Sequence, residues 1–93
     1  MDDSWYTKQL QNSDVRLTEA RELVLGIFLQ NGNKHLTAEE IFFEAHKVNQ
    51  SVGISTIYRT IDLFVTHRLV QKFEFGEGKA RFELKPDPDN AGH

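Results

Sequence analysis

The sequence predicts a mainly α-helical domain that ends in a small β-hairpin. Apolar residues recur at helical spacing in four successive segments, and after about residue 68 the apolar period changes to two. A loop that contains two glycines separates the two alternating runs, as in a hairpin. The 93 residues are enough for one domain with a modest hydrophobic core.

The first two helices are predicted over residues 2–12 and from about residue 19 to residue 31. The first would be short and amphipathic, with Trp5 and Leu10 on its apolar side. Thr18 suits the N-cap of the second, because its hydroxyl can accept a hydrogen bond from a free first-turn N–H. Residues 31–34, Asn-Gly-Asn-Lys, would end that helix, since Gly and Asn tolerate the left-handed conformation of a helix end.

A capping box predicts the start of the third helix. The Thr37 hydroxyl can accept from the N–H of Glu40, and the Glu40 carboxylate can reach back to the N–H of Thr37. A turn over residues 49–53 then leads to the fourth helix, with Ser55 as its expected N-cap and an end near His67 or Arg68. The expected buried residues are Ile41, Phe42, Ala45 and Val48 in the third helix and Ile57, Ile61, Phe64 and Val65 in the fourth.

The last regular element is a predicted hairpin formed by LVQKFEF and ARFEL around the loop GEGK. Gly76 and Gly78 can supply the positive φ angles that such a turn requires. The whole pattern is that of a winged helix-turn-helix with an additional N-terminal helix, occupying residues 1–85. Because Pro86 and Pro88 end regular pairing, residues 86–93 are expected to begin a linker to a second domain that this chain lacks.

Charge and composition limit the possible partners and the location. The formal net charge is −3, but residues 4–85 carry 11 Lys/Arg and ten Asp/Glu, a balance of +1. A nucleic-acid-binding face must therefore be local. The absence of cysteine excludes disulfides and thiolate metal sites. The chain has neither a signal-peptide pattern nor an apolar run of the ~20 residues that span a membrane, so a cytoplasmic location is expected.

The residues with the clearest chemistry lie in the segment GISTIYRT. In DNA-binding helix-turn-helix domains, the first residues of the second helix contact base edges. Ser55 and Thr56 suit phosphate oxygens at the helix N-terminus. Tyr58 offers a ring for a thymine methyl and a hydroxyl for a phosphate, and Arg59 can bind a phosphate or a guanine edge. Basic residues that could line the same surface are Arg16, a candidate minor-groove contact, Arg21 and Lys79, with Lys72 nearby.

Two other classes of function are open. A winged helix can be a protein-interaction module without sequence-specific DNA binding, which the net acidic charge favours slightly. The protein-interaction alternative is favoured if acids such as Glu19, Glu22 and Asp62 dominate the surface around Tyr58. DNA binding is favoured if Arg16, Arg21, Arg59 and Lys79 lie on that surface. An enzyme is not expected, because the sequence shows no nucleophile with a base, no paired carboxylates in a motif and no phosphate loop.

Four blocks in order, RLTEAR, HLTAEEIFFEA, GISTIYRTIDLFVTHRLV and GKARFEL, closely resemble the N-terminal domain of ferric uptake regulator (Fur) family repressors. The resemblance runs from about Arg16 to Leu84. It implies the operator-recognition domain of a homodimeric, metal-responsive transcription factor that binds AT-rich palindromic double-stranded DNA. It also implies that Tyr58 and Arg59 contact DNA bases and that Arg16 contacts the minor groove. Arg21 and Lys79 would contact the DNA backbone.

The same resemblance implies part of a metal site. His35 and Glu83 match two ligands of a divalent ion (Fe, Zn or Mn), whereas His46 and His67 match none. The other ligands would come from a His-rich stretch, of which His93 could be the first residue, and from the absent domain. This chain alone is therefore expected to hold no metal tightly and to be a monomer or weak dimer.

Overall fold

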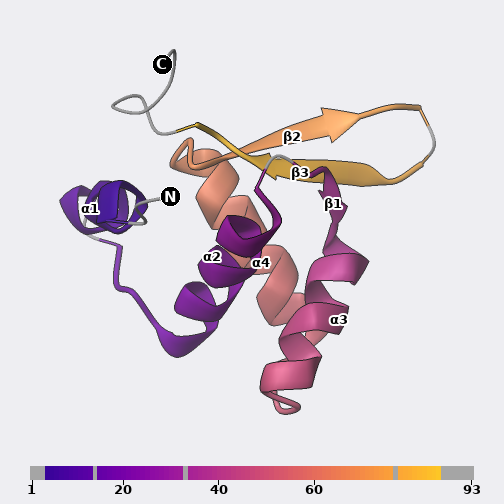
Figure 1. Ribbon diagram of the computed structural model, residues 1–93, viewed down its shortest axis with the longest axis horizontal. Coiled ribbons are helices and arrows are strands. Elements are labelled where there is room, and N and C mark those ends of the chain that lie inside the picture. Colours follow the sequence, from indigo (N-terminus) through magenta and orange to yellow (C-terminus); the bar gives the residue numbers. More distant parts are fainter. Residues whose placement is uncertain (1–3, 14, 33, 77, 87–93) are drawn as a thin grey trace.

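The computed structural model of the chain describes residues 4–13, 15–32, 34–76 and 78–86. In this part of the chain the helices are α1 (Ser4–Asn12), α2 (Glu19–Asn31), α3 (Ala38–Val48) and α4 (Ile54–Thr66), and the strands are β1 (Leu36–Thr37), β2 (Val70–Glu74) and β3 (Ala80–Leu84). Figure 1 shows α2, α3 and α4 packed below the sheet, α1 to one side, and the β2–β3 hairpin extending past the helices. This arrangement confirms a winged helix-turn-helix with an additional N-terminal helix.

Local capping chemistry fixes the ends of α2 and the start of α3 as predicted. The Arg21 N–H donates to the Thr18 hydroxyl at 3.2 Å, and Gly32, with a φ of 58°, ends α2. At the start of α3, the Glu40 N–H donates to the Thr37 hydroxyl at 3.1 Å, and the Thr37 N–H donates to the Glu40 carboxylate at 2.8 Å. These reciprocal bonds satisfy two backbone donors that a helix start leaves free.

The start of α4 differs from the prediction. Gly53, not Ser55, is the N-cap, with an extended backbone and no side-chain capping bond. The Ile57 N–H donates to the Gly53 carbonyl at 3.3 Å, so the helix begins earlier than a Ser55 cap would allow. Glycine is an acceptable N-cap because its backbone stays accessible to water, and Ser55 therefore becomes the second residue of the helix.

The sheet has the strand order β1-β3-β2, and both pairs are antiparallel. The predicted hairpin is confirmed, with φ angles of 76° at Gly76 and 80° at Gly78. Strand β1 was not predicted, because two residues are too few to show an alternating pattern. Its pairing of Leu36 with Phe82 places the segment before α3 alongside β3.

The core is a single cluster drawn from all four helices and from β2 and β3. Phe28, Ile41 and Phe64 are among its fully buried side chains. Of the expected core positions, Phe42 and Val65 are only half-buried, and the prediction for Val48 was wrong. Val48 is 74% exposed because it is the last residue of α3, beyond the turns that pack against the other elements.

Helix α1 closes one end of this core. Leu10 is buried as expected, but the main contact is Tyr6, which is fully buried while Trp5 packs edge-on against it. The Tyr6 hydroxyl donates to the Lys85 carbonyl at 2.7 Å, and the Lys85 N–H donates to the Leu69 carbonyl at 2.8 Å. Helix α1 is thus hydrogen-bonded to Lys85, the residue that follows β3. Most of the expected linker, residues 87–93 with His93, lies outside the described residues.

None of the helices within the described ranges is long and apolar enough to span a membrane.

Candidate nucleic-acid interface

Tyr58 lies on α4, just beyond its first turn, and is 43% exposed. Its hydroxyl donates a hydrogen bond of 2.8 Å to a carboxylate oxygen of Glu39, on the first turn of α3. The tyrosine expected to contact bases is therefore tied to the neighbouring helix, although both side chains are reached by solvent.

This hydrogen bond shifts the acidities of both partners in opposite directions. Donation from Tyr58 is the largest of the effects that lower the pKa of the Glu39 carboxyl, followed by its own backbone N–H, with a smaller contribution from Lys79. The same bond is the main reason that the pKa of the Tyr58 phenol is raised. Both shifts favour the state in which Glu39 is charged and Tyr58 keeps its proton.

A hollow of about 260 Å³ lies beside this pair, between the two helices and the hairpin. Its polar lining combines two lysines and two carboxylates with the tyrosine: Glu39, Tyr58, Asp62, Lys72 and Lys79. The structure thus brings Lys79 and Lys72 to the same surface as Tyr58, as predicted. It also places Asp62 there, one of the acids that would favour a protein partner.

The first turn of α4 presents backbone donors next to exposed side chains. Because Gly53 is the N-cap, the N–H groups of residues 54–56 have no acceptor within the helix. Ser55 and Arg59 are exposed, and Thr56 is half-buried. The Thr56 carbonyl accepts from the buried Thr60 hydroxyl at 2.8 Å, which satisfies that hydroxyl inside the helix.

Arg16 and Arg21 form a separate pair at the start of α2. The Arg21 guanidinium donates to the Arg16 carbonyl at 2.6 Å, which holds the segment before α2 against its first turn. The Arg16 side chain is exposed. Among the described contacts, none joins this pair to Tyr58 or Lys79.

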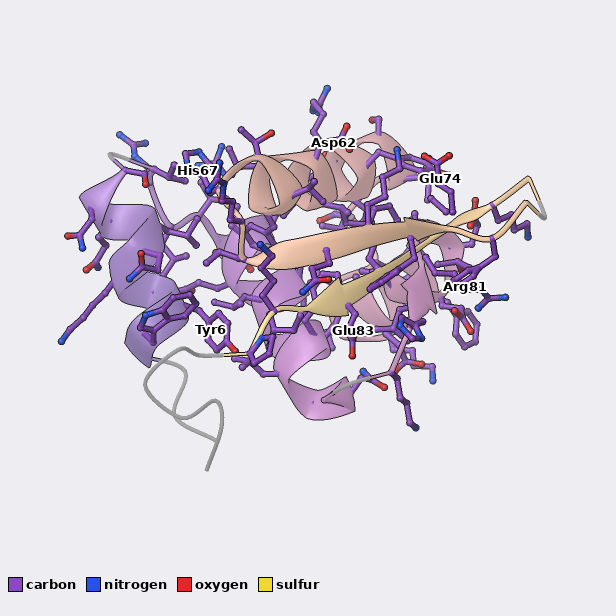
Figure 2. The ribbon with its side chains drawn as sticks, turned by 90° about the horizontal axis from the view of Figure 1, so that it is seen from above. Tyr6, Asp62, His67, Glu74, Arg81 and Glu83 are labelled. Carbon is purple, nitrogen blue, oxygen red and sulfur yellow. The ribbon has the colours of Figure 1, made fainter. Side chains whose placement is uncertain are left out.

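The predicted metal ligands are brought together. His35 precedes β1 and Glu83 lies on β3, and the Leu36–Phe82 pairing brings their side chains within reach. The His35 Nε2 lies 3.3 Å from a Glu83 carboxylate oxygen. Figure 2 shows Asp62 on α4, beside the hairpin, and Glu83 on β3. Ala80 and Phe82 of β3 line the hollow beside Tyr58, and successive side chains of a strand point to opposite faces, so Glu83 points away from that hollow.

Imidazole and carboxylate donors suit Fe²⁺, Mn²⁺ or Zn²⁺ in kind but not in number. Within the described ranges, no group of three or more His, Cys, Asp or Glu side chains could hold an ion. His35 and Glu83 therefore fit part of a divalent metal site.

Two groups of contacts in the structure were not predicted from the sequence. One is Glu39, which lies 19 residues from its partner Tyr58. The other surrounds His35, whose ring packs edge-on against Phe73 and Phe75 at centroid distances of 4.7 and 5.9 Å. Nothing local in the sequence indicates that His35 lies beside Phe73, because the two residues are far apart along the chain.

Taken together, the capped helix pair, the α4 surface and the glycine-turned hairpin define a winged helix-turn-helix domain. Residues 12–93 match the profile of the Ferric uptake regulator family. The chain belongs to that family, and its fold and motifs agree with the assignment.

Several relatives can be compared directly. The ferric uptake regulation protein of Bacillus subtilis is 34% identical over 80 residues, which cover 86% of this chain and 54% of that protein. The solved Vibrio cholerae ferric uptake regulator has a TM-score of 0.78 at 25% identity, covering 89% of this chain and 63% of the other. For the Pseudomonas aeruginosa regulator solved with manganese, the TM-score is 0.75 at 27% identity, with coverages of 84% and 58%.

The chain spans about half the length of the curated relatives that it matches. Those relatives are named as regulators of uptake and not as enzymes, in agreement with the absence of a catalytic motif in this sequence.

Proposed function

We propose that this chain is the operator-recognition domain of a metal-responsive transcriptional repressor. The observation that carries this proposal is the surface on which Tyr58 of α4 lies with two basic residues of the hairpin, Lys72 and Lys79. A recognition helix beside a basic wing suits a DNA groove and the phosphates that flank it. The similar Vibrio cholerae regulator is described as having DNA-binding domains, which supports the same role for this chain.

Each part of the surface has a distinct task in this proposal. The Tyr58 ring would contact thymine methyl groups, and Arg59 a base edge or phosphate. Ser55, Thr56 and the free N–H groups of residues 54–56 would bind phosphate oxygens at the helix N-terminus. Lys79 and Arg21 would contact the sugar–phosphate backbone of the DNA, and Arg16 would contact its minor groove.

The proposed ligand is an AT-rich palindromic duplex in the cytoplasm. A palindrome requires two copies of the domain at a fixed separation, so the longer protein would act as a homodimer. This chain alone would bind one half-site.

The proposed metal response depends on His35 and Glu83. Each would give one ligand atom, and the remaining ligands would come from parts of the longer protein. A divalent ion bound there would supply a fixed link between this domain and the rest of that protein. The two side chains would thereby couple metal occupancy to the angle between the two α4 helices of a dimer.

In a protein of the relatives' full length, Glu83→Ala should abolish the metal dependence of operator binding while leaving metal-free binding unchanged. Metal dependence that survives Glu83→Ala would contradict the proposed role of this pair.

DNA recognition is tested by titrating the chain into a fluorescent AT-rich palindrome and a scrambled duplex of equal composition. Tyr58→Ala should lower the preference for the palindrome roughly 5- to 150-fold, the range for loss of one base contact. Tyr58→Phe, which keeps the ring but loses the hydroxyl, should lower it less than Tyr58→Ala does. Arg59→Ala should weaken binding, and its effect on the preference shows whether Arg59 contacts a base or a phosphate.

Glu39 and Asp62 in the same hollow give some support to the alternative, a protein-interaction module. Equal affinity of wild type for both duplexes would contradict sequence-specific recognition and favour that alternative.

A further inference from the structure

Glu39 is an unexpected residue on a surface proposed to bind DNA. Its carboxylate lies in the hollow with Lys72 and Lys79 and accepts the Tyr58 hydroxyl at 2.8 Å. A carboxylate at such a place repels phosphates, which lowers affinity for every DNA sequence. A carboxylate that weakens DNA binding at this place is expected to have another role, and its hydrogen bond with Tyr58 indicates which role that is.

We propose that Glu39 is a positioning residue that sets the specificity of DNA recognition by holding the Tyr58 ring in one orientation. This inference rests on the proposed function. It assigns the ring, and not the hydroxyl, as the group with which Tyr58 recognises DNA.

The assignment of the ring follows from hydrogen-bond capacity. A phenol carries one O–H donor, whereas a phosphate oxygen can only accept. The Tyr58 donor is already given to Glu39, so a phosphate contact through it would require the bond to break. The ring needs no donor, and 43% of the residue's surface remains exposed for contact.

The effect on specificity follows from conformational entropy. An exposed tyrosine that is free to rotate must be ordered when it contacts a base, which typically weakens binding about 2- to 12-fold. Anchoring by Glu39 removes this cost before DNA arrives. Complexes with unrelated sequences depend on phosphate contacts and not on an ordered Tyr58 ring. The anchor therefore raises mainly the affinity for the sequence whose bases Tyr58 contacts.

Two substitutions separate the anchor from the charge. Glu39→Ala removes both, whereas Glu39→Gln removes the charge but keeps an oxygen that can accept the Tyr58 hydroxyl. Glu44 supplies matched controls, because it is a 48% exposed carboxylate on the same helix that pairs with Lys47 at 3.1 Å. Glu44→Ala and Glu44→Gln remove an α3 charge without touching Tyr58.

The experiment measures the affinity of each variant for the AT-rich palindrome and for the scrambled duplex at a fixed salt concentration. Glu39→Ala should lower the ratio of the two affinities by about 2- to 12-fold. Glu39→Gln should raise both affinities and keep the ratio near that of wild type. The Glu44 variants should keep the wild-type ratio, and thermal unfolding should show that all variants are folded.

A DNA-free readout tests positioning directly. NMR couplings of Tyr58 should report one χ1 rotamer in wild type and Glu39→Gln, and rotamer averaging in Glu39→Ala. An unchanged affinity ratio in Glu39→Ala, or an averaged rotamer already in wild type, would overturn the inference while leaving the proposed function intact. A wild type that does not prefer the palindrome would overturn the proposed function and the inference together.

Discussion

The hydroxyl of Tyr58 and the carboxylate of Glu39 form the contact that most directly links the sequence to the proposed recognition of DNA. It joins α4 to the first turn of α3, next to Lys79 of the hairpin. The geometry accounts for both pKa shifts, because the hydrogen bond from the Tyr58 hydroxyl stabilises the charged Glu39 carboxylate and the protonated Tyr58 phenol. At this scale the protein orients one aromatic ring with one exposed hydrogen bond.

The hydrogen bond between Tyr58 and Glu39 should be detectable in a pH titration of the Tyr58 phenol. The Tyr58 phenol should titrate above the usual tyrosine range in wild type and at lower pH in Glu39→Ala, because the acceptor that favours the protonated phenol is lost. NMR of the tyrosine rings measures this, with Tyr58→Phe identifying the signal. An identical phenol pKa in wild type and Glu39→Ala would show that the hydrogen bond does not persist in solution.

The same shifts set the pH window in which the contact stabilises the fold. Glu39, whose pKa is lowered, contributes stability that is present above the usual glutamate pKa and is lost as pH falls through the lowered value. Tyr58, whose pKa is raised, contributes stability that is lost as pH rises through the raised value. At neutral pH the pair is therefore in its stabilising state.

The helices and strands show which features the sequence could predict. The caps of α2 and α3 were predicted correctly, because each depends on residues within one helical turn, such as Thr37 and Glu40. Strand β1 and the contact between Glu39 and Tyr58 depend on segments that only the tertiary fold brings together. The start of α4 was misplaced because Ser55 and Gly53 are both acceptable N-caps and local preference could not separate them.

The capping box of α3 supports the helix that carries Glu39. Thr37→Ala should lower the free energy of unfolding by about 1 kcal/mol, within the usual range of roughly 0.5–2 kcal/mol for loss of a Thr cap. Thr66→Ala, at an exposed position at the end of α4, is the control and should change the free energy of unfolding by less than about 0.5 kcal/mol. Chemical denaturation measures both, and equal effects of the two substitutions would argue against the cap.

The whole domain separates two candidate sites. The hollow beside Tyr58 is lined by Ala80 and Phe82 of β3, whereas Glu83, which contacts His35, points to the opposite face of that strand. The proposed metal ligands could therefore face another part of a longer protein while DNA is bound at the proposed interface around Tyr58. The family resemblance implied His35 and Glu83, and the structure places them 3.3 Å apart, but their number alone shows that the site needs further ligands.

Binding to DNA should depend on salt in proportion to the few basic residues involved. Four phosphate contacts, from Arg21, Arg59, Lys72 and Lys79, would give a slope of log affinity against log salt with a magnitude of at most about 3.6. Lys79→Ala should reduce the magnitude of that slope by about 1, equally on specific and scrambled DNA. Lys47→Ala is the control, because Lys47 pairs with Glu44 and stacks on Phe43, and its slope should match wild type.

The most direct test of the central claim is an NMR titration of the ¹⁵N-labelled chain with an AT-rich half-site duplex and with a scrambled duplex. Recognition by α4 and the wing predicts amide shifts at residues 54–59 and 78–80 with both duplexes, and larger, saturating shifts at Tyr58 and Arg59 with the half-site alone. Shifts confined to the exposed face of α3 around Phe43, or identical shifts with the two duplexes, would contradict the claim that this domain recognises an operator sequence through α4.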